Sequence, residues 1–306
     1  MKKDIDILCV GEVLIDFIGN QLNNNINQTS NYQRHLGGSP SNVAMNMVQL
    51  GLRTTLVATV GNDGFGNYII DRLNAAQIDI QHIKKLKNIP TSNIIISRSS
   101  KTPEFIAYRA ADYQIRVNQI PNNLLKRSKI FHTSCFALSK NPAQKTILSK
   151  AQKAIDYNCK LSIDINYSNQ IWPNRAKAIE IIKHFCQFNP LVKISMDDVY
   201  RLFGNNFTSQ QVFEFFHEQN VEIICLTLGS KGVKLSQKNK KTISLPAVKI
   251  DKIIDVTGAG DAFWSGFLFA YLNEYSLQKC LETALKLAAL KLQNVGRLPD
   301  NIDILQ

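Results

Sequence analysis

Apolar residues follow two different spacings along this 306-residue chain. Short apolar runs alternate with longer segments in which apolar residues recur every three or four positions. The short runs are typical of buried strands, and the longer segments are typical of helices that cover a sheet. The pattern therefore indicates a succession of strands and helices.

In the first half, strands are expected at 5–10 and 54–60, and helices at 42–50 and 65–76. Between about 90 and 117 apolar and polar residues alternate one by one, which predicts exposed antiparallel strands. The Asn- and Gln-rich stretch 21–33 is expected to be a loop beside these strands.

The second half alternates more regularly. Strands are expected at 130–134, 160–164, 191–195, 222–228 and 232–236, and helices at 142–157, 175–188, 197–203, 209–219, 261–273 and 276–293. This alternation implies an α/β fold with a doubly wound, mainly parallel sheet that binds ligands at the carboxyl ends of its strands. We expect one domain over 1–306, with a small antiparallel β lid formed by about 12–34 and 90–117.

The charge balance is basic, with a net charge of +12 and a pI of about 9.4. This balance suits an anionic substrate, but the lysines are scattered, and the short basic runs at 84–87 and 238–241 are expected in loops. A solvated face explains such runs more simply, and no nucleic-acid motif accompanies them. No nucleic-acid partner is therefore expected.

The six cysteines form no C-x-x-C pair, and several lie in apolar runs. They are typical of reduced core residues of a cytosolic protein. The five histidines show no metal-ligand spacing, and no stretch is long enough to span a membrane. We expect a cytoplasmic protein without a membrane partner.

The segment Asp255-Val256-Thr257-Gly258-Ala259-Gly260-Asp261 stands directly before an apolar run. Small residues let a ligand approach backbone N–H groups, and a helix N-terminus favours an anion. A carboxylate beside that anion could take a proton from a hydroxyl that attacks a phosphoryl group. These residues alone could equally form a tight turn with a favourable first-turn charge, so a second signal is needed.

A second glycine-rich segment, Gly37-Gly38-Ser39-Pro40-Ser41-Asn42, leads into the helix expected at 42–50. Its glycines allow close approach of a ligand, and the Asn42 amide can bond to hydroxyls. In this order and separation, the two segments resemble the two signatures of the PfkB/ribokinase family of carbohydrate kinases, in particular of its fructokinase-like members. The resemblance implies a ribokinase-like fold.

Shorter matches extend this resemblance over nearly the whole chain. The stretch Gly11–Phe17, which contains Asp16, is similar to the family's first strand. The other matches are Arg109-Ala110-Ala111-Asp112, Asp164-Ile165-Asn166 with Trp172-Pro173, Thr227-Leu228-Gly229-Ser230-Lys231-Gly232, and Gly296 with Pro299.

The resemblance implies an ATP-dependent kinase in which Asp261 is the general base on a primary hydroxyl. The amides of Gly258, Ala259 and Gly260 would stabilise the transferred phosphoryl group. The other implied roles are sugar contacts by Asp16, Gly37, Gly38, Asn42, Arg109, Asp112 and Asn166, nucleotide contacts by Thr227, Gly229, Lys231 and Gly232, Mg²⁺ binding through water by Asp198, and binding of a monovalent cation such as K⁺ by Asp255 and Thr257.

Structural alternatives stay open for several of these residues. Asp16 could cap the end of a strand, and Asn166 could cap a loop. Arg109 and Asp112 could form only an exposed ion pair, which would contribute little. Lys231 could face solvent, and Asp255 with Thr257 could only form a turn.

Three departures from the family pattern bear on the site. Asp198 stands where a Glu is usual, which shortens the magnesium-linked acid by one methylene. Ser168 stands where an arginine is usual, so one cationic contact is missing. Ser39 and Ser41 stand where fructokinases usually carry alanines, which is a mild change.

The sequence favours phosphorylation of a free sugar, with fructose first. The alternatives are a 2-keto-3-deoxygluconate kinase, then a nucleoside kinase, then a non-catalytic regulator that binds sugar or nucleotide. Exposed antiparallel strands leave unpaired edges, which proteins usually cover. A homodimer formed through the lid is therefore expected.

Overall fold

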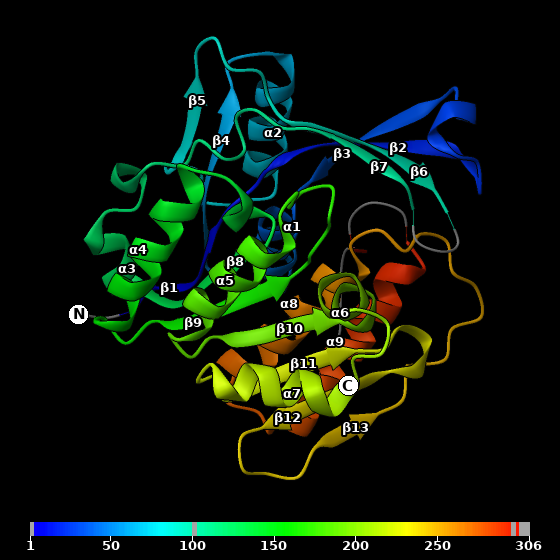
Figure 1. Ribbon diagram of the computed structural model, residues 1–306. Helices are drawn as coiled ribbons and strands as arrows, with labels where there is room; N and C mark the ends of the chain where they lie inside the picture. The colour runs from blue at the N-terminus through cyan, green and yellow to red at the C-terminus, as the bar shows by residue number, and fades with distance from the viewer. Residues whose placement is uncertain (1–2, 100–102, 295–297, 300–306) are drawn as a thin grey trace.

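The computed structural model describes residues 3–99, 103–294 and 298–299, and within them one large sheet organises the chain (Figure 1). Its nine strands lie in the order β13-β12-β11-β10-β9-β8-β1-β4-β5. They are β1 (Ile5–Val10), β4 (Thr54–Gly61), β5 (Ile83–Leu86), β8 (Ser128–Ser134), β9 (Lys160–Ile165), β10 (Leu191–Ser195), β11 (Ile223–Thr227), β12 (Val233–Gln237) and β13 (Ile243–Leu245). Only β12 and β13 pair antiparallel with their neighbours.

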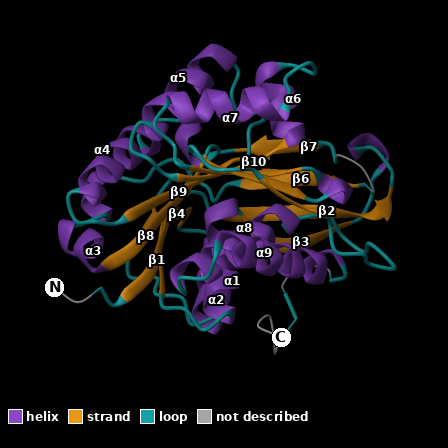
Figure 2. Ribbon diagram, turned by 90° about the horizontal axis from the view of Figure 1, so that it is seen from below, coloured by secondary structure: helices purple, strands orange, loops and turns teal. Residues whose placement is uncertain are grey.

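Helices cover both faces of this sheet (Figure 2). One face carries α3 (Asn122–Arg127), α4 (Ala143–Ile155), α5 (Arg175–Cys186), α6 (Met196–Phe203) and α7 (Ser209–Glu218). The other carries α1 (Ser39–Gln49), α2 (Gly64–Ala75), α8 (Ala259–Leu272) and α9 (Leu277–Leu292). Strands buried on both faces explain the continuous apolar runs in the sequence. The doubly wound, mainly parallel α/β fold is confirmed.

A second sheet of four strands extends from the large one (Figure 1). Its order is β3-β2-β6-β7, from β2 (Leu14–Leu22), β3 (Tyr32–Gly37), β6 (Asn93–Arg98) and β7 (Phe105–Tyr108). The pairs β2–β3 and β6–β7 are antiparallel, whereas β2 and β6 pair in parallel. The expected small sheet is present, with this one parallel pairing inside it.

The loop expected at 21–33 connects β2 to β3, although its ends belong to these two strands and Ile26–Gln28 forms a short 3-10 helix. Asp16 lies within β2, inside the stretch expected to contribute to the small sheet. One local expectation was wrong. Lys84 and Lys85 lie in the edge strand β5, not in a loop, and both are exposed there. Charged residues are common on edge strands, which the hydrophobic pattern alone does not reveal.

The core contains the cysteines. All six are buried and free of disulfides, as expected.

No helix in the described part of the chain is long and apolar enough to cross a membrane. Gly296 lies outside the described residues, whereas the Pro299 carbonyl accepts a hydrogen bond from Gln49 Nε2 at 2.8 Å.

Candidate active site

Two helix N-termini meet at the carboxyl edge of the large sheet. Helix α1 begins at Ser39, three residues earlier than expected, because Pro40 fits the first turn, where no N–H is required. Helix α8 begins at Ala259, after Gly258 in a left-handed conformation at φ +75°. Asn42 and Asp261 therefore both lie in first turns, at the end of each helix that favours an anion.

Asp261 is held by two donors from α1. Ser39 Oγ donates to Asp261 Oδ1 at 2.6 Å, and Asn42 Nδ2 donates to Asp261 Oδ2 at 2.8 Å. Burial nevertheless raises the pKa of Asp261 to about 6, helped by the nearby Asp164 carboxylate. The structure thus brings together the two glycine-rich segments that the sequence singled out, 219 residues apart in the Asn42–Asp261 contact.

Asp16 faces the same region from β2. Its side chain is buried, and it has no hydrogen-bond donor among the residues that the structure describes. Burial raises its pKa to about 7, and Asp261 and Asp255 add to the shift. A Cβ at Gly37 would overlap the Asp16 carboxylate, so this position requires glycine. A buried carboxylate without donors fits a site where a ligand supplies hydroxyl groups.

Glycines before α8 leave backbone donors free. Within the described residues, the amides of Gly258 and Gly260 have no hydrogen-bond acceptor, whereas the Ala259 amide donates to the Val256 carbonyl at 3.2 Å. The expected three-amide arrangement therefore has two free members, Gly258 and Gly260. Free amides at a helix N-terminus can bind an anion.

A buried ion pair lies beneath this helix end, which the sequence analysis missed. Lys193 Nζ contacts Asp164 Oδ2 at 2.8 Å, and both side chains are almost fully buried. A Cβ at Gly260 would lie 2.8 Å from Lys193 Nζ. Burial alone would lower the pKa of Lys193, but Asp164, Asp198 and Asp261 raise it overall. The only signal in the sequence was a lysine inside an apolar strand.

Glu12 is a second buried acid that the sequence analysis did not assign. It accepts hydrogen bonds from the Ser39 amide at 3.0 Å and from Ser134 Oγ at 2.7 Å. Burial raises its pKa to about 8. Its backbone carbonyl also excludes a Cβ at Gly38, which adopts φ +104°. Glu12 thus ties the first turn of α1 to the end of β8.

Arg109 and Asp112 form a buried ion pair, not the exposed one considered from the sequence. Arg109 Nη2 lies 2.6 Å from Asp112 Oδ2, and the two side chains are 4% and 0% exposed. Asp112 also accepts from Ser92 Oγ at 2.6 Å. Arg109 contacts Ser139 as well. The carboxylate of Asp112 is thus enclosed by protein, so its proposed contact with sugar stays a prediction without geometric support.

The remaining substrate and nucleotide candidates lie along the same sheet edge. The Asn166 side chain accepts from the Phe136 amide at 3.0 Å, which is the loop-capping alternative. Thr227 ends β11, and Gly229 and Lys231 lie in the 3-10 helix that follows, with Lys231 exposed. At position 232 a Cβ would overlap the Leu245 carbonyl, so close packing alone explains why a glycine stands there. Their nucleotide contacts stay predictions.

The candidate cation ligands are engaged with protein groups. Asp198 accepts from Ser195 and pairs with Arg201 Nη1 at 2.8 Å. Asp255 pairs with Lys291 Nζ at 3.5 Å, and the Thr257 amide donates to Asp255 Oδ1 at 3.0 Å. No group of three or more His, Cys, Asp or Glu side chains suited to a metal ion occurs in the described part of the chain. A magnesium ion contacted only through water does not require such a group.

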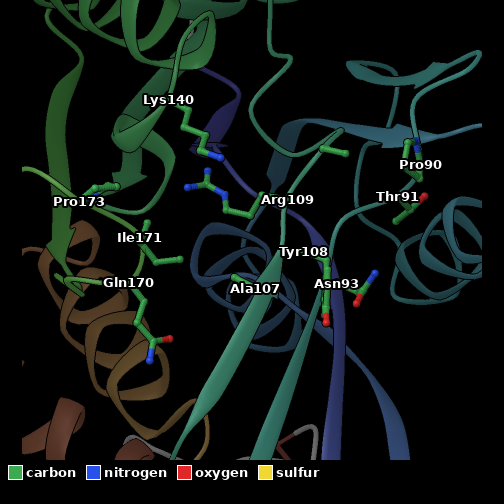
Figure 3. A pocket seen from close by; sticks show the side chains of 11 residues that line it. Pro90, Thr91, Asn93, Ala107, Tyr108, Arg109, Lys140, Gln170, Ile171 and Pro173 are labelled. Carbon is green, nitrogen blue, oxygen red and sulfur yellow. The ribbon is translucent and has the colours of Figure 1, made fainter.

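A cavity of about 450 Å³ opens between the small sheet and the loop after β9 (Figure 3). Its lining includes Asn93, Arg109, Lys140 and Gln170, and Figure 3 shows Lys140 and Arg109 pointing toward one another. Asp261 does not line it. Glu12 and Asp261 are both bound by Ser39, through its backbone amide and its hydroxyl respectively.

Comparison with known proteins agrees with this geometry. A model of the pfkB family carbohydrate kinases matches residues 4–302. A protein of Thermoanaerobacterium thermosaccharolyticum named ATP-dependent 6-phosphofructokinase is 33% identical over 302 residues, covering 99% of this chain and 92% of that protein. A 5-dehydro-2-deoxygluconokinase of Mesomycoplasma hyopneumoniae is 29% identical, covering 100% and 93%.

Solved structures give the same result. The fructokinase of Halothermothrix orenii superposes with a TM-score of 0.83 at 32% identity, covering 94% of this chain and 99% of that one. The ribokinase-like fold expected from the two glycine-rich segments is thereby confirmed over nearly the full length. The chain belongs to the pfkB family and is an ATP-dependent carbohydrate kinase.

Proposed function

We propose that this kinase transfers the γ-phosphoryl group of ATP to a primary hydroxyl of a free sugar, with fructose as the preferred acceptor. The observation that carries the proposal is the Asp261 carboxylate, oriented by Ser39 and Asn42 at the N-terminus of α8. Burial raises the pKa of Asp16, and the negative charge of Asp261 adds to this shift, as expected for two carboxylates that face one region. The H. orenii fructokinase adds support for fructose.

In the proposed reaction, Asp261 takes the proton of the acceptor hydroxyl. The hydroxyl oxygen forms a bond to the γ-phosphorus, and the bond between that phosphorus and the bridging oxygen breaks, which leaves its electron pair on ADP. Free amides of Gly258 and Gly260 would bind the equatorial oxygens as charge develops on them. Asp16 would accept hydrogen bonds from sugar hydroxyls and so fix which hydroxyl reaches Asp261.

Magnesium would reach the site with the nucleotide. Asp198 lies in the first turn of α6, where a water-mediated contact to the ion would be compatible with its pairing to Arg201. Burial raises the pKa of Asp198 to about 6. A bound cation would supply charge neutralisation for the phosphates.

A second candidate acceptor is a sugar that already carries a negative group. The cavity is lined by Lys140 and by Arg109, whose charge is already paired with Asp112, and no carboxylate lines it. Lys140 has no carboxylate partner in the described part of the chain. The names of two relatives, a 6-phosphofructokinase and a 5-dehydro-2-deoxygluconokinase, fit such acceptors.

A coupled assay of ADP production decides between these acceptors. The panel contains fructose, fructose 6-phosphate, 2-keto-3-deoxygluconate, 5-dehydro-2-deoxygluconate and adenosine, each with MgATP. We expect the highest kcat/KM with fructose. A higher value with one of the three anionic acceptors favours the second candidate, and activity on adenosine alone contradicts both. Binding of sugar or nucleotide without ADP production from any acceptor favours a non-catalytic regulator.

We also propose that the protein forms a homodimer through the small sheet. On β7, Ile106 and Tyr108 are 43% and 55% exposed and alternate with half-buried neighbours, so they lie on one face. Strand β7 is also an edge of the sheet, with unpaired backbone groups on its outer side. A second copy could cover both features.

A further inference from the structure

A carboxylate that needs a cation stands just before α8. The Asp255 side chain is 8% exposed, so its charge is largely removed from water. Its Oδ1 accepts a hydrogen bond from the Thr257 amide at 3.0 Å, within the turn that leads to Gly258. A buried carboxylate of this kind is costly unless a positive charge compensates it.

Lys291 supplies that charge from the last turn of α9. Its side chain is 6% exposed, and its Nζ lies 3.5 Å from Asp255 Oδ2 and donates to the Asn294 carbonyl at 3.1 Å. The Lys291 chain also packs on the turn itself, because a Cβ at Gly258 would lie 3.5 Å from Lys291 Cε.

These residues do not fit the monovalent cation that the family resemblance assigns to Asp255 and Thr257. A lysine ammonium already pairs with Asp255 Oδ2, and a K⁺ ion at that carboxylate would have to share it with a second positive charge. We propose that the Lys291 ammonium takes the place of the activating monovalent cation in this protein. In that role Lys291 neutralises Asp255 and holds the turn that positions Gly258 and Asp261, so the kinase needs no K⁺.

The catalytic part of this proposal rests on the proposed kinase reaction. A second readout, the melting temperature, is independent of that reaction. The comparison uses the wild type and Lys291→Ala, which removes the ammonium and opens space for an ion. Lys279→Ala is the matched control, because Lys279 lies on the same helix, its side chain is 38% exposed, and its Nζ pairs with Glu282 at 3.9 Å, away from Asp255. Each protein is studied in chlorides of K⁺, Na⁺ and tetramethylammonium at one ionic strength, since tetramethylammonium is too large to enter the site.

The first readout is kcat with MgATP and the best acceptor of the panel. Wild type and Lys279→Ala should give the same rate in all three salts. Lys291→Ala should lose about tenfold or more in tetramethylammonium, because Asp255 is then buried without a partner, and K⁺ should restore most of that rate. A wild type that K⁺ activates severalfold over tetramethylammonium overturns the proposal, as does a Lys291→Ala variant with unchanged rates.

The second readout is the melting temperature without any substrate. An ion that binds only the folded state raises the melting temperature as its concentration increases. Lys291→Ala should therefore gain stability with K⁺ beyond its gain with tetramethylammonium, whereas wild type should respond equally to both. Equal responses of all three proteins overturn the proposal. If no acceptor in the panel supports ADP production, the proposed function fails while this second readout still decides the role of Lys291.

Discussion

The carboxyl edge of the large sheet and the small sheet differ in how their polar and apolar groups are satisfied. At the edge, charged and hydroxyl side chains are buried and tied to specific partners, as in the contacts of Ser39 and Asn42 with Asp261 and of Lys193 with Asp164. In strands β6 and β7 of the small sheet most side chains are half-buried, and β7 presents Ile106 and Tyr108 to solvent.

This difference separates two tasks of a kinase. Stabilising charge on a transferred phosphoryl group requires dipoles and charges that are already in place, and only a densely packed edge holds them so. Choosing an acceptor requires a surface whose side chains vary without disturbing that edge. The densely packed edge accounts for a reaction class that follows from the site, whereas we expect the choice of acceptor to depend on the small sheet and the cavity beside it.

The largest expected effect comes from removing the base at the edge. Asp261→Asn keeps the size of the side chain but cannot take the hydroxyl proton, so kcat should fall on the order of 10²–10⁴-fold. Steady-state kinetics measures the loss, and circular dichroism checks that the fold is kept. Asp251→Asn is the control, because Asp251 is exposed in the loop before α8. Near-normal turnover of Asp261→Asn would remove Asp261 from the proposed reaction.

The next largest effect is expected on the free energy of unfolding, from the buried pair of Lys193 and Asp164 beneath α8. Lys193→Met leaves Asp164 buried without its partner, which should lower the free energy of unfolding by about 3–5 kcal/mol. Lys177→Met breaks an exposed pair with Glu180 and should change it by less than about 1 kcal/mol. Urea denaturation measures both variants. Equal losses from the two would contradict the contrast between the buried edge and the exposed surface.

A smaller change tests how Ser39 acts on Asp261. A base with a pKa of about 6 must be deprotonated, so wild-type activity should decline as the pH falls through about 6. Ser39→Ala removes a hydrogen bond that favours the charged carboxylate, so the acidic limb of the kcat profile should move to higher pH by about one unit. The other charges facing Asp261 are Asp16, Asp164, Lys193 and Lys291, and they are unchanged in this variant.

Ser41→Ala is the matched control for that profile. Ser41 Oγ donates to the carbonyls of Gly37 and Gly38 and does not contact Asp261. Its loss should leave the acidic limb where it is in wild type. A profile of Ser39→Ala that coincides with that of Ser41→Ala would show that Ser39 only supports the loop.

The smallest effect on the folded chain is expected in the small sheet. Ile106→Lys places a charge on an exposed position, so the free energy of unfolding of the monomer should change by no more than about 0.5 kcal/mol. The same charge should disrupt the proposed homodimer, which sedimentation velocity measures as a shift from dimer to monomer. A monomeric wild type at working concentrations argues against this interface.

Hydrophobic spacing was enough to predict most strands of the large sheet and most of the helices that cover it, and the two glycine-rich segments predicted that Asn42 and Asp261 belong to one site. Strands of the small sheet were harder to place, because half-buried strands such as β3 carry polar residues on both sides.

The sequence by itself determined the fold class and the family and singled out Asp261 as the candidate base, because these depend on local patterns and on two segments in a fixed order. Only the tertiary structure decided which partner each buried charged group meets. Lys193 with Asp164, Lys291 with Asp255 and Glu12 with Ser39 are joined across strands and helices far apart in the chain. A buried charge is stable only beside its partner, and no periodicity along the chain records which partner that is.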